Sequence, residues 1–396
     1  MKVFLDYYKG KMQLKKILNI FGTRPEAVKM APLIKEMSKS DILDSRVCVT
    51  GQHREMLDQV LEFFEINPEY NLDVMEPGQS LTGLTASMLS RLEYVYSDFK
   101  PDLVLVHGDT SSTLAGCLSA YYEKVPVGHV EAGLRTGNLD RPWPEEGNRK
   151  IVGAISHLHF APTSAAAKNL SNEGLSKKNI HITGNTVIDA LLWTKNKIET
   201  DIILQSQLSK EFPMIQSNRK MILVTTHRRE NFGNGLKNIC QAIREIALTH
   251  PETDIVLPVH LNPEVSQTVL KLLANIKNIY LIKPQEYCKF VFLMMNAYMI
   301  ITDSGGLQEE APALGKPVLV MRNETEREEA LVAGTAKLVG TEVMNIIHSF
   351  NMLLKNSHSY DEMAFATNPY GDGTASRKIV EILEAHFGVP ILRKNL

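Results

Sequence analysis

Short runs of β-branched and aliphatic residues alternate with helix-like stretches along nearly the whole chain. The runs are KILNIF (16–21), RVCVT (46–50), DLVLVHG (102–108), PVGHVE (126–131), MILVTTH (221–227), DIVLPVH (254–260), IYLIKP (279–284), MIITDS (299–304) and PVLVM (317–321). Strands that alternate with helices in this way form parallel sheets whose faces are covered by the helices. The pattern therefore predicts an α/β fold.

The strand-like runs form two series, which are separated by a helix and a polar stretch at about 187–219. A chain of 396 residues also exceeds one ordinary hydrophobic core. We therefore predict two doubly wound, Rossmann-like domains that face each other, at residues 1–185 and 186–370. The first convincing strand begins near Lys16, so residues 1–14 are expected to be an extension and Met12 an alternative start.

Composition and charge exclude several classes of partner. The 43 basic and 45 acidic side chains leave a formal charge of −2, which gives no reason to expect nucleic acid or anionic membrane as a partner. The four cysteines are far apart and form no CxxC motif, which favours a reduced, cytoplasmic setting. The sequence has no apolar run of membrane-spanning length and no signal-peptide pattern at its start.

Ligands of parallel sheets bind beyond the carboxyl ends of the strands, so the residues that follow each run are the ones to inspect. In GTRPE, Thr23 and Glu26 have the spacing of a capping box, which predicts a helix beginning at the strand end. A helix N-terminus attracts anions, and Arg24 and Lys29 add positive charge to it. Two solvated surface cations are the alternative interpretation. Pro32 is expected to bend or restart this helix.

A second predicted anion site follows the run MIITDS. Gly305 and Gly306 come directly after Ser304, and two glycines allow backbone N–H groups to approach a phosphate closely. Glu310, one to two turns further along the expected helix, is placed to accept hydrogen bonds from a ribose diol. A plain turn is the alternative, because glycines at such positions are common.

A third group of candidates is acidic. Asp109 and Glu131 each follow a histidine at i, i+2 near a strand end, and Glu145 and Arg149 come shortly after them. Carboxylates beside an anion site are unfavourable unless they transfer protons or bind cations. Helix capping by Asp109 and Glu145 is one alternative. A two-metal site is another, although the chain has no HExxH motif or clustered His/Cys ligand set.

Two further strand ends carry candidates. His227 lies with Arg228 and Arg229 in THRREN, a cluster that points to phosphate. Gln285 and Phe290 could bracket a flat base by hydrogen bonding and stacking, although core packing of Phe290 is an equally good interpretation. The chain has no GxGxxG motif, so nicotinamide and flavin cofactors are not implied.

From about Lys15 to its C-terminus, the chain resembles the bacterial non-hydrolysing UDP-N-acetylglucosamine 2-epimerases. The motifs that carry the resemblance are GTRPEAVKMAP, HGDT, GHVEAGLRT, PWPEE, THRREN, PVHLNP, TDSGG, LGKPVLV and NPYGDG. The resemblance implies a glycosyltransferase-B-like fold with the active site in the cleft between the domains. It also implies a homodimer, and a C-terminal helix within 371–396 that packs back toward the first domain.

The resemblance also implies roles for individual residues. Those expected to bind UDP are Arg24, Lys29, His227, Gln285, Phe290, Ser304, Gly305, Gly306, Glu310 and Arg327. Those expected at the sugar are Asp109, Glu131 and Glu145, with Arg149 beside them. Gln52, Arg228 and His260 match an activator site that some members possess. Glu55 and Gly78 differ from members with a well-defined activator site, and Glu328 replaces a proline of the family's usual TERPE motif.

The implied reaction is the epimerisation of UDP-GlcNAc to UDP-ManNAc at C2, without cofactor or metal, for cell-envelope polysaccharide. Breaking the C1–O bond first makes the C2 hydrogen acidic, so that UDP leaves and a glycal intermediate forms. Cations stabilise the departing diphosphate while a carboxylate removes the proton. Asp109, Glu131, Glu145 and His227 are the expected catalytic residues.

Three other functions remain open at this level. A hydrolysing epimerase would release free N-acetylmannosamine and UDP, and GTRPEAVKMAP and THRREN match it less well. A glycosyltransferase would share the fold but has no need of three carboxylates at the sugar. A catalytically silent sugar-nucleotide sensor would tolerate neutral residues at Asp109, Glu131 and Glu145, and all three acids are present.

Overall fold

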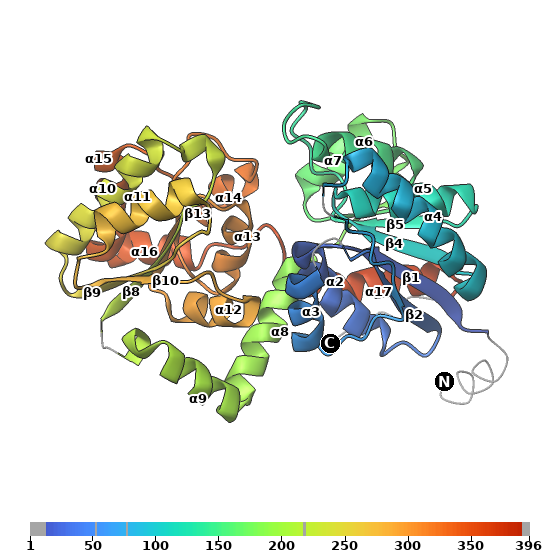
Figure 1. Cartoon of the computed structure of the whole chain (residues 1–396), viewed down its shortest axis with the longest axis horizontal. Coiled ribbons are helices and arrows are strands. Elements are labelled where there is room, and N and C mark those ends of the chain that lie inside the picture. The colour runs from blue at the N-terminus through green and yellow to red at the C-terminus, as the bar shows by residue number, and fades with distance from the viewer. Residues whose placement is uncertain (1–12, 52–53, 77, 217–218, 390–396) are drawn as a thin grey trace. The chain divides into compact units, whose positions relative to one another are not determined.

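The computed structural model describes residues 13–51, 54–76, 78–216 and 219–389, and the chain divides into two compact units. Unit 1 runs to Ala190 and resumes at Tyr370, whereas unit 2 is Leu191–Pro369. Each unit is built around its own sheet (Figure 1). Within these ranges no helix is both long and apolar enough to span a bilayer.

Unit 1 has a seven-stranded sheet in the order β3-β2-β1-β4-β5-β6-β7, and every neighbouring pair is parallel. Its strands are β1 (Lys15–Phe21), β2 (Leu43–Val49), β3 (Tyr70–Asn71), β4 (Leu103–His107), β5 (Val127–Val130), β6 (Leu158–Ala161) and β7 (Ile180–Ile182). Its α-helices are α2 (Arg24–Met37), α3 (Arg54–Phe63), α4 (Leu81–Phe99), α5 (Ser111–Tyr122), α6 (Glu145–Ile155), α7 (Ser164–Asn172) and α17 (Ala375–His386).

Unit 2 has a six-stranded parallel sheet in the order β10-β9-β8-β11-β12-β13. Its strands are β8 (Lys220–Thr225), β9 (Thr253–Pro258), β10 (Ile279–Ile282), β11 (Met299–Thr302), β12 (Val318–Val320) and β13 (Ala336–Leu338). Its α-helices are α9 (Ile202–Glu211), α10 (Asn234–Thr249), α11 (Pro263–Leu273), α12 (Tyr287–Asn296), α13 (Gly305–Ala313), α14 (Glu328–Val332), α15 (Val343–Lys355) and α16 (Ser357–Ala364). Helix α8 (Thr186–Thr200) begins in unit 1 and ends in unit 2.

The strand order reverses once in each sheet, between β1 and β4 in unit 1 and between β8 and β11 in unit 2. At such a switch point the loops leave neighbouring strands in opposite directions and open a crevice for ligands. The turns that follow these four strands contain GTR, GDT, THR and DSG. The fold therefore places the conspicuous polar motifs of the sequence at two topological switch points.

The cores explain why these strands are almost continuously apolar. Every residue of β4 is buried, as expected for a parallel strand with helices on both faces. Leu18, Ile20, Val104 and Val106 pack with the buried sides of α4 and α5. Helix α17 packs against α2 and so returns the C-terminal segment to unit 1 (Figure 1). In unit 2, the buried faces of α10, α11 and α15 share one core with β8, β9 and β11.

The predicted α/β fold with two Rossmann-like units is confirmed. The nine apolar runs coincide with nine of the thirteen strands in the described part of the chain. The strands without a predicted run, β3, β6, β7 and β13, have only two to four residues each, too few for a clear pattern. Of the two expectations for Pro32, a bend or a restart of the helix, the restart is wrong, because α2 continues through Pro32 to Met37.

Candidate functional site

Glu131 is the centre of a buried polar cluster in unit 1. Its carboxylate accepts a hydrogen bond from Lys29 Nζ on α2 and one of 2.8 Å from Asn185 Nδ2, which lies just after β7. His107 at the end of β4 places Nε2 3.9 Å from the same carboxylate. The side chain of Glu131 is only 9% exposed, so this charge depends on its partners.

The backbone at Glu131 is as unusual as its surroundings. Its φ of 61° lies in the left-handed region, which a non-glycine residue rarely adopts. The facing residue Gly108 has a φ of 68°, and a Cβ added there would lie 3.7 Å from Oε1 of Glu131. Strained residues of this kind persist where the surrounding structure holds them, often at functional sites. The turns after β4 and β5 therefore lie beside each other, and both have a residue in the left-handed region.

Asp109 is the second carboxylate of this part of the site. Its Oδ2 lies 2.5 Å from Nη2 of Arg149 on α6, and its backbone oxygen accepts a 2.8 Å hydrogen bond from Asn148. Arg149 also contacts the fully buried Glu146, whose oxygens accept hydrogen bonds from two backbone N–H groups of the 136–137 turn. Helix α6 thus fixes the Asp109 turn from one side. Thr110, not Asp109, caps α5, so the capping alternative is wrong for Asp109.

The protonation states in this cluster are set mainly by burial. Burial raises the pKa of Asp109, the positive charge of Arg149 lowers it, and the negative charge of Glu131 raises it again. Burial lowers the pKa of His107 to about 4, so its ring is neutral at physiological pH. A carboxyl group with a raised pKa beside a cation-paired carboxylate is a suitable arrangement for acid–base chemistry.

The first predicted anion site begins at the N-terminus of α2. Arg24 is exposed there, and its side chain makes no hydrogen bond or ion pair with the described residues. Lys29 lies one turn further on and contacts Glu131. Glu26 is 2% exposed and accepts hydrogen bonds from the N–H groups of Gly22 and Thr23, which forms its half of the predicted capping box.

The second predicted anion site, in unit 2, is the start of α13. Ser304, Gly305 and Gly306 lead into this helix, whose first N–H groups have no partner within the helix. A Cβ on Gly305 would lie 2.8 Å from Oε1 of Glu326 and 3.2 Å from Nη2 of Arg228, which form an ion pair of 3.2 Å. An anionic side chain and a cation therefore already lie beside this helix end.

Three further residues of α13 contact neighbouring segments of unit 2 through buried polar side chains. Glu310 accepts a 3.0 Å hydrogen bond from the hydroxyl of Tyr287 on α12. Glu309 pairs with Arg327, and Gln308 accepts a 2.7 Å hydrogen bond from Thr325. The 325–327 segment is therefore held against α13. Arg327, which we expected at the phosphates, has a carboxylate neighbour in this structure.

His227 follows β8 and lies close to Asp303, which follows β11. The two side chains are 3.2 Å apart between Nδ1 of His227 and Oδ1 of Asp303. The ring of His260 stacks on His227 with 5.9 Å between ring centroids. Arg228 is the next residue and carries the ion pair to Glu326. Strand pairing of β8 with β11 thus brings THRREN and TDSGG to one place in unit 2.

Four predicted residues are less closely tied to these clusters. Gln285 is half-buried and its amide donates to the backbone oxygen of Lys283, while Phe290 is half-buried on α12. Glu145 is the first residue of α6 and makes no side-chain hydrogen bond with the described part of the chain. Gln52, predicted at an activator site, lies outside the described residues.

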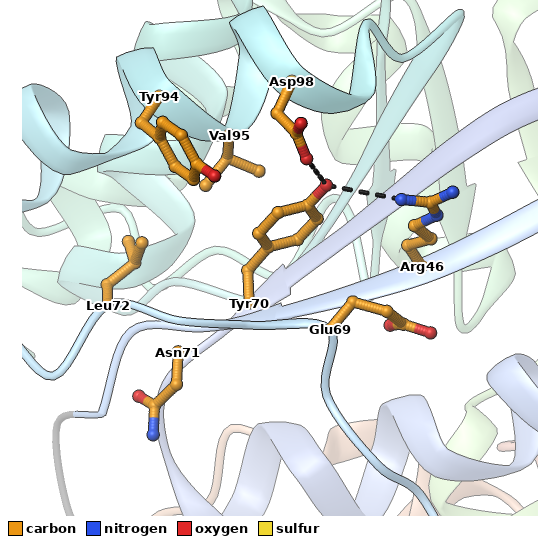
Figure 2. A pocket seen from close by; sticks show the side chains of 8 residues that line it. All are labelled: Arg46, Glu69, Tyr70, Asn71, Leu72, Tyr94, Val95 and Asp98. Atoms are coloured by element: carbon orange, nitrogen blue, oxygen red, sulfur yellow. Dashed lines mark hydrogen bonds between the residues drawn. The ribbon is translucent and has the colours of Figure 1, made fainter.

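A separate pocket of about 480 Å³ lies at the β3 edge of unit 1. It is lined by Arg46, Glu69, Tyr70, Asn71, Leu72, Tyr94, Val95 and Asp98 (Figure 2). The hydroxyl of Tyr70 points between Asp98 and Arg46, at 2.6 and 3.4 Å. None of the predicted site residues lines this pocket, and its central polar groups satisfy one another.

Sequence reasoning missed four residues of these clusters: Glu26 as a link between turns, Asn148, Asn185 and Asp303. Asn185 ends the HITGN segment and Asp303 the MIITD segment, so the strand-end rule could have found both. Asn148 and the second role of Glu26 depend on contacts across unit 1, which no local pattern reveals.

Two Rossmann-like units are the architecture of the glycosyltransferase-B-like fold. Unit 1 carries the cation-paired carboxylates, and unit 2 carries the helix that begins with two glycines. Among the described residues no group of three or more His, Cys, Asp or Glu side chains is arranged to hold a metal ion.

Comparison with known proteins narrows this class. The family model for UDP-N-acetylglucosamine 2-epimerase matches residues 35–384. The UDP-N-acetylglucosamine 2-epimerase of Escherichia coli K12 is 54% identical over 369 residues, which are 93% of this chain and 98% of that protein. The chain belongs to the UDP-N-acetylglucosamine 2-epimerase family, whose members are isomerases.

Solved structures agree with this assignment. A Neisseria meningitidis UDP-GlcNAc 2-epimerase bound to UDP-GlcNAc superposes with a TM-score of 0.87 at 53% identity, covering 93% of this chain and all of that one (100%). The Methanocaldococcus jannaschii enzyme, in complex with UDP-GlcNAc and UDP, superposes with a TM-score of 0.76 at 34% identity, over 94% of this chain and 100% of that chain.

Proposed function

We propose that the protein interconverts UDP-GlcNAc and UDP-ManNAc by inverting C2 of the sugar, without cofactor or metal. UDP is eliminated to leave a glycal intermediate and is then added back. The proposal is supported by membership of the family and by relatives whose structures contain UDP-GlcNAc or UDP.

The nucleotide is assigned to unit 2. The N-terminus of α13 and its two glycines bind the diphosphate through backbone N–H groups, and His227 donates to the same oxygens. Glu310, which Tyr287 orients, accepts hydrogen bonds from the ribose hydroxyls. Gln285 and Phe290 contact the uracil. Arg24 from unit 1 adds positive charge to the diphosphate, and Arg327 does so if it leaves Glu309.

The sugar is assigned to the carboxylates of unit 1, Asp109, Glu131 and Glu145, with Arg149 orienting Asp109. In the elimination, the C1–O bond breaks and its electron pair leaves with UDP. A carboxylate takes the C2 proton, and the electrons of that C–H bond form the C1–C2 double bond. Positive charge developing at C1 makes this proton removable, because the C2 hydrogen of the intact sugar is too weakly acidic.

Re-addition reverses these steps on the other face of C2. A second acid delivers a proton there, and the diphosphate oxygen attacks C1. A group with a raised pKa such as Asp109 can hold that proton near neutral pH. UDP and the glycal must remain bound together until this occurs.

One observation carries the proposal: Asp109 and Glu131 lie on the ends of adjacent strands, each paired with a different cation, Arg149 and Lys29. Two carboxylates with separate partners and different environments can serve as the acid and the base that an epimerisation needs. A simple sugar-nucleotide binding protein has no need of either.

Three accompanying features belong to the same proposal. The enzyme works as a homodimer in the cytoplasm and supplies a cell-envelope polysaccharide. Substrate activation uses Gln52, Arg228 and His260, the three residues that match the family's activator site. Glu328, which replaces the family's usual proline, adds negative charge to the segment after Arg327 and weakens diphosphate binding there.

Incubation with UDP-GlcNAc in D₂O tests the function. We expect UDP-ManNAc to form with deuterium at C2 of both sugars, without added metal or nicotinamide. Release of free N-acetylmannosamine would identify a hydrolysing enzyme instead. Unchanged UDP-GlcNAc without deuterium, in a protein that still binds UDP, would contradict the proposal and favour a sensor.

A further inference from the structure

Asp303, the residue between β11 and Ser304, carries a fully buried carboxylate. Its exposed fraction is 0%, and it lies at the switch point of the unit 2 sheet, next to the turn that starts α13. A buried charge is retained only where hydrogen bonds and opposite charges compensate for the loss of water. The groups that surround this carboxylate therefore indicate its purpose.

Among the described residues, all hydrogen-bond donors to this carboxylate come from the segment that follows β8. The backbone N–H groups of His227 and Arg228 lie 2.9 and 3.0 Å from Oδ2. The Thr226 hydroxyl and the Asn231 amide each lie 3.1 Å from the same oxygen. Burial alone would raise the pKa of Asp303, but the hydrogen bonds and charge of His227, with these N–H groups, hold it below its ordinary value.

The other oxygen, Oδ1, faces the ring of His227 at 3.2 Å from Nδ1. An ionised carboxylate can only accept hydrogen bonds, so a hydrogen bond across this 3.2 Å contact requires the hydrogen to be on Nδ1 of His227. In the neutral ring, Nε2 is then an acceptor, and in the imidazolium it is a donor. No described residue forms a hydrogen bond with Nε2, and the stacked ring of His260 limits rotation of the His227 plane.

We propose that Asp303 is a positioning residue that fixes His227 in the Nδ1–H tautomer, so that every proton the ring gains or loses passes through Nε2. In the imidazolium state the same carboxylate balances the ring charge while Nε2–H donates to the departing diphosphate. This inference rests on the proposed function, which assigns His227 to the diphosphate. It extends that function to a residue whose side chain need not touch the substrate.

A purely structural role for Asp303 predicts something different. The same carboxylate holds the 226–231 segment through backbone and side-chain hydrogen bonds, which any fold-stabilising residue could do. The two roles can be separated because Thr226 contacts Oδ2 and not the imidazole. Thr226→Val removes one of the holding hydrogen bonds and leaves the Oδ1 contact to His227 in place.

The test compares the full-length wild type with Asp303→Asn and Thr226→Val, each labelled with ¹⁵N-histidine. The His227 signals are assigned with His227→Gln. We expect the neutral ring of the wild type and of Thr226→Val to be protonated at Nδ1. In Asp303→Asn the new amide donates to Nδ1, so that the hydrogen moves to Nε2.

Turnover and binding complete the test. We expect kcat of Asp303→Asn to fall roughly 10²- to 10⁴-fold, as when a wrong tautomer is imposed on a catalytic histidine. The Kd of Asp303→Asn for UDP should change by less than about threefold. The kcat of Thr226→Val should also change by less than about threefold. Should Asp303→Asn fail to fold, the tautomer of His227 in the wild type decides whether the inference holds.

Three results would overturn the inference: a wild-type ring protonated at Nε2, an Asp303→Asn variant with unchanged tautomer and kcat, or a loss of UDP affinity equal to the loss of kcat. The NMR measurement needs no turnover. A wild type that binds UDP but does not epimerise would therefore refute the proposed function, while the tautomer would still report on Asp303.

Discussion

Gly305 is the residue whose replacement most directly tests the assigned diphosphate site. In Gly305→Ala the new methyl group would meet only the ends of two flexible side chains, Glu326 and Arg228, which can move. We therefore expect the free energy of unfolding to change by less than about 1 kcal/mol. The methyl would hold a phosphate away from the α13 N–H groups, so the affinity for UDP should fall at least about tenfold by calorimetry.

Gly235 provides the matched control. It also lies in the first turn of a helix, α10, and a Cβ there meets its nearest neighbour, Cγ2 of Thr341, at an ordinary 3.6 Å. Gly235→Ala should leave UDP affinity unchanged. Equal affinities for UDP in the two variants would remove the α13 N-terminus from the site.

Replacement of Asp109 should change both the activity and the stability of the protein. In Asp109→Asn we expect kcat to fall roughly 10²- to 10⁴-fold while UDP binding is retained. Because burial raises the pKa of Asp109, the folded state disfavours its ionised form, and its contribution to stability is lost as pH rises through the folded-state pKa. The variant should therefore unfold at a higher urea concentration than the wild type at pH 7, with a smaller difference at acidic pH.

Asp98→Asn is the control for this substitution. Its carboxylate accepts a 2.6 Å hydrogen bond from Tyr70 in the separate pocket at the β3 edge (Figure 2). Activity should be unchanged in this variant. Wild-type turnover in Asp109→Asn would show that Asp109 does not transfer a proton.

At the scale of elements, Glu26 joins two strand-end turns of unit 1. Besides the N–H groups of its own turn, it accepts hydrogen bonds from the hydroxyls of Thr110 at 2.7 Å and Thr113 at 3.1 Å. Glu26→Ala removes the acceptor of the Gly22 and Thr23 N–H groups and one acceptor of the Thr110 hydroxyl, whereas the Thr113 hydroxyl still donates to the backbone oxygen of His107. The loss should destabilise unit 1 by about 3–5 kcal/mol in urea denaturation. Burial raises the pKa of Glu26, so Glu26→Gln, which resembles the protonated acid, should cost much less.

Glu36→Ala on the same helix is the control, because Glu36 pairs with Lys39 near the surface at 2.6 Å. Such pairs contribute little, so the change should stay below about 1 kcal/mol. If Glu26→Ala were no more destabilising than Glu36→Ala, the hydrogen bonds that join the β1–α2 and β4–α5 turns would not contribute measurably to the free energy of unfolding.

The helices and strands that could be predicted were those whose signals lie close together in the sequence. The longer strands are apolar runs of four or more residues, and Thr23 and Glu26 are close enough in sequence to reveal a helix start. Lys29 and Glu131 are 102 residues apart, so the sequence indicated a cation at the diphosphate rather than a partner for Glu131. Asp303 was overlooked because its neighbours Gly305 and Gly306 form the more familiar pattern.

At the scale of the whole molecule, the fold class was predictable because strand–helix alternation is repeated in both units. The location of the candidate sites was predicted from one topological rule, since the reversal of strand order puts β1 beside β4 and β8 beside β11. The pairings within each site were not predictable, because they depend on which side chains meet across the crevice. Residue types could be assigned to a region, but hydrogen-bond partners could not.

The buried histidines of unit 1 lead to a prediction about the whole molecule in acid. His107, His129 and His159 are at most 3% exposed and lie on three neighbouring strands. Burial is the main cause that lowers the pKa of His107 to about 4, of His129 to about 3 and of His159 to about 4. In the unfolded chain a histidine has a pKa of about 6.5.

These bases have depressed folded-state pKa values, so their stabilising contribution is present above about pH 6.5 and is lost as the pH falls toward 4. Within this window the unfolded chain binds up to three more protons, which lowers the free energy of unfolding by at most about 4 kcal/mol per pH unit. In unit 2, the buried His250 has Glu252 and Asn351 as hydrogen-bond partners of its ring nitrogens.

Unit 1 should therefore lose stability before unit 2 when the pH is lowered from 7 to 5. Amide hydrogen exchange in increasing urea, followed peptide by peptide and corrected for the intrinsic effect of pH, measures the two units separately. His159→Gln removes one of the three titrating groups, so the pH slope for unit 1 should fall by about one third. Equal loss of stability in both units, with a slope that His159→Gln does not change, would show that carboxylates rather than these histidines govern acid unfolding.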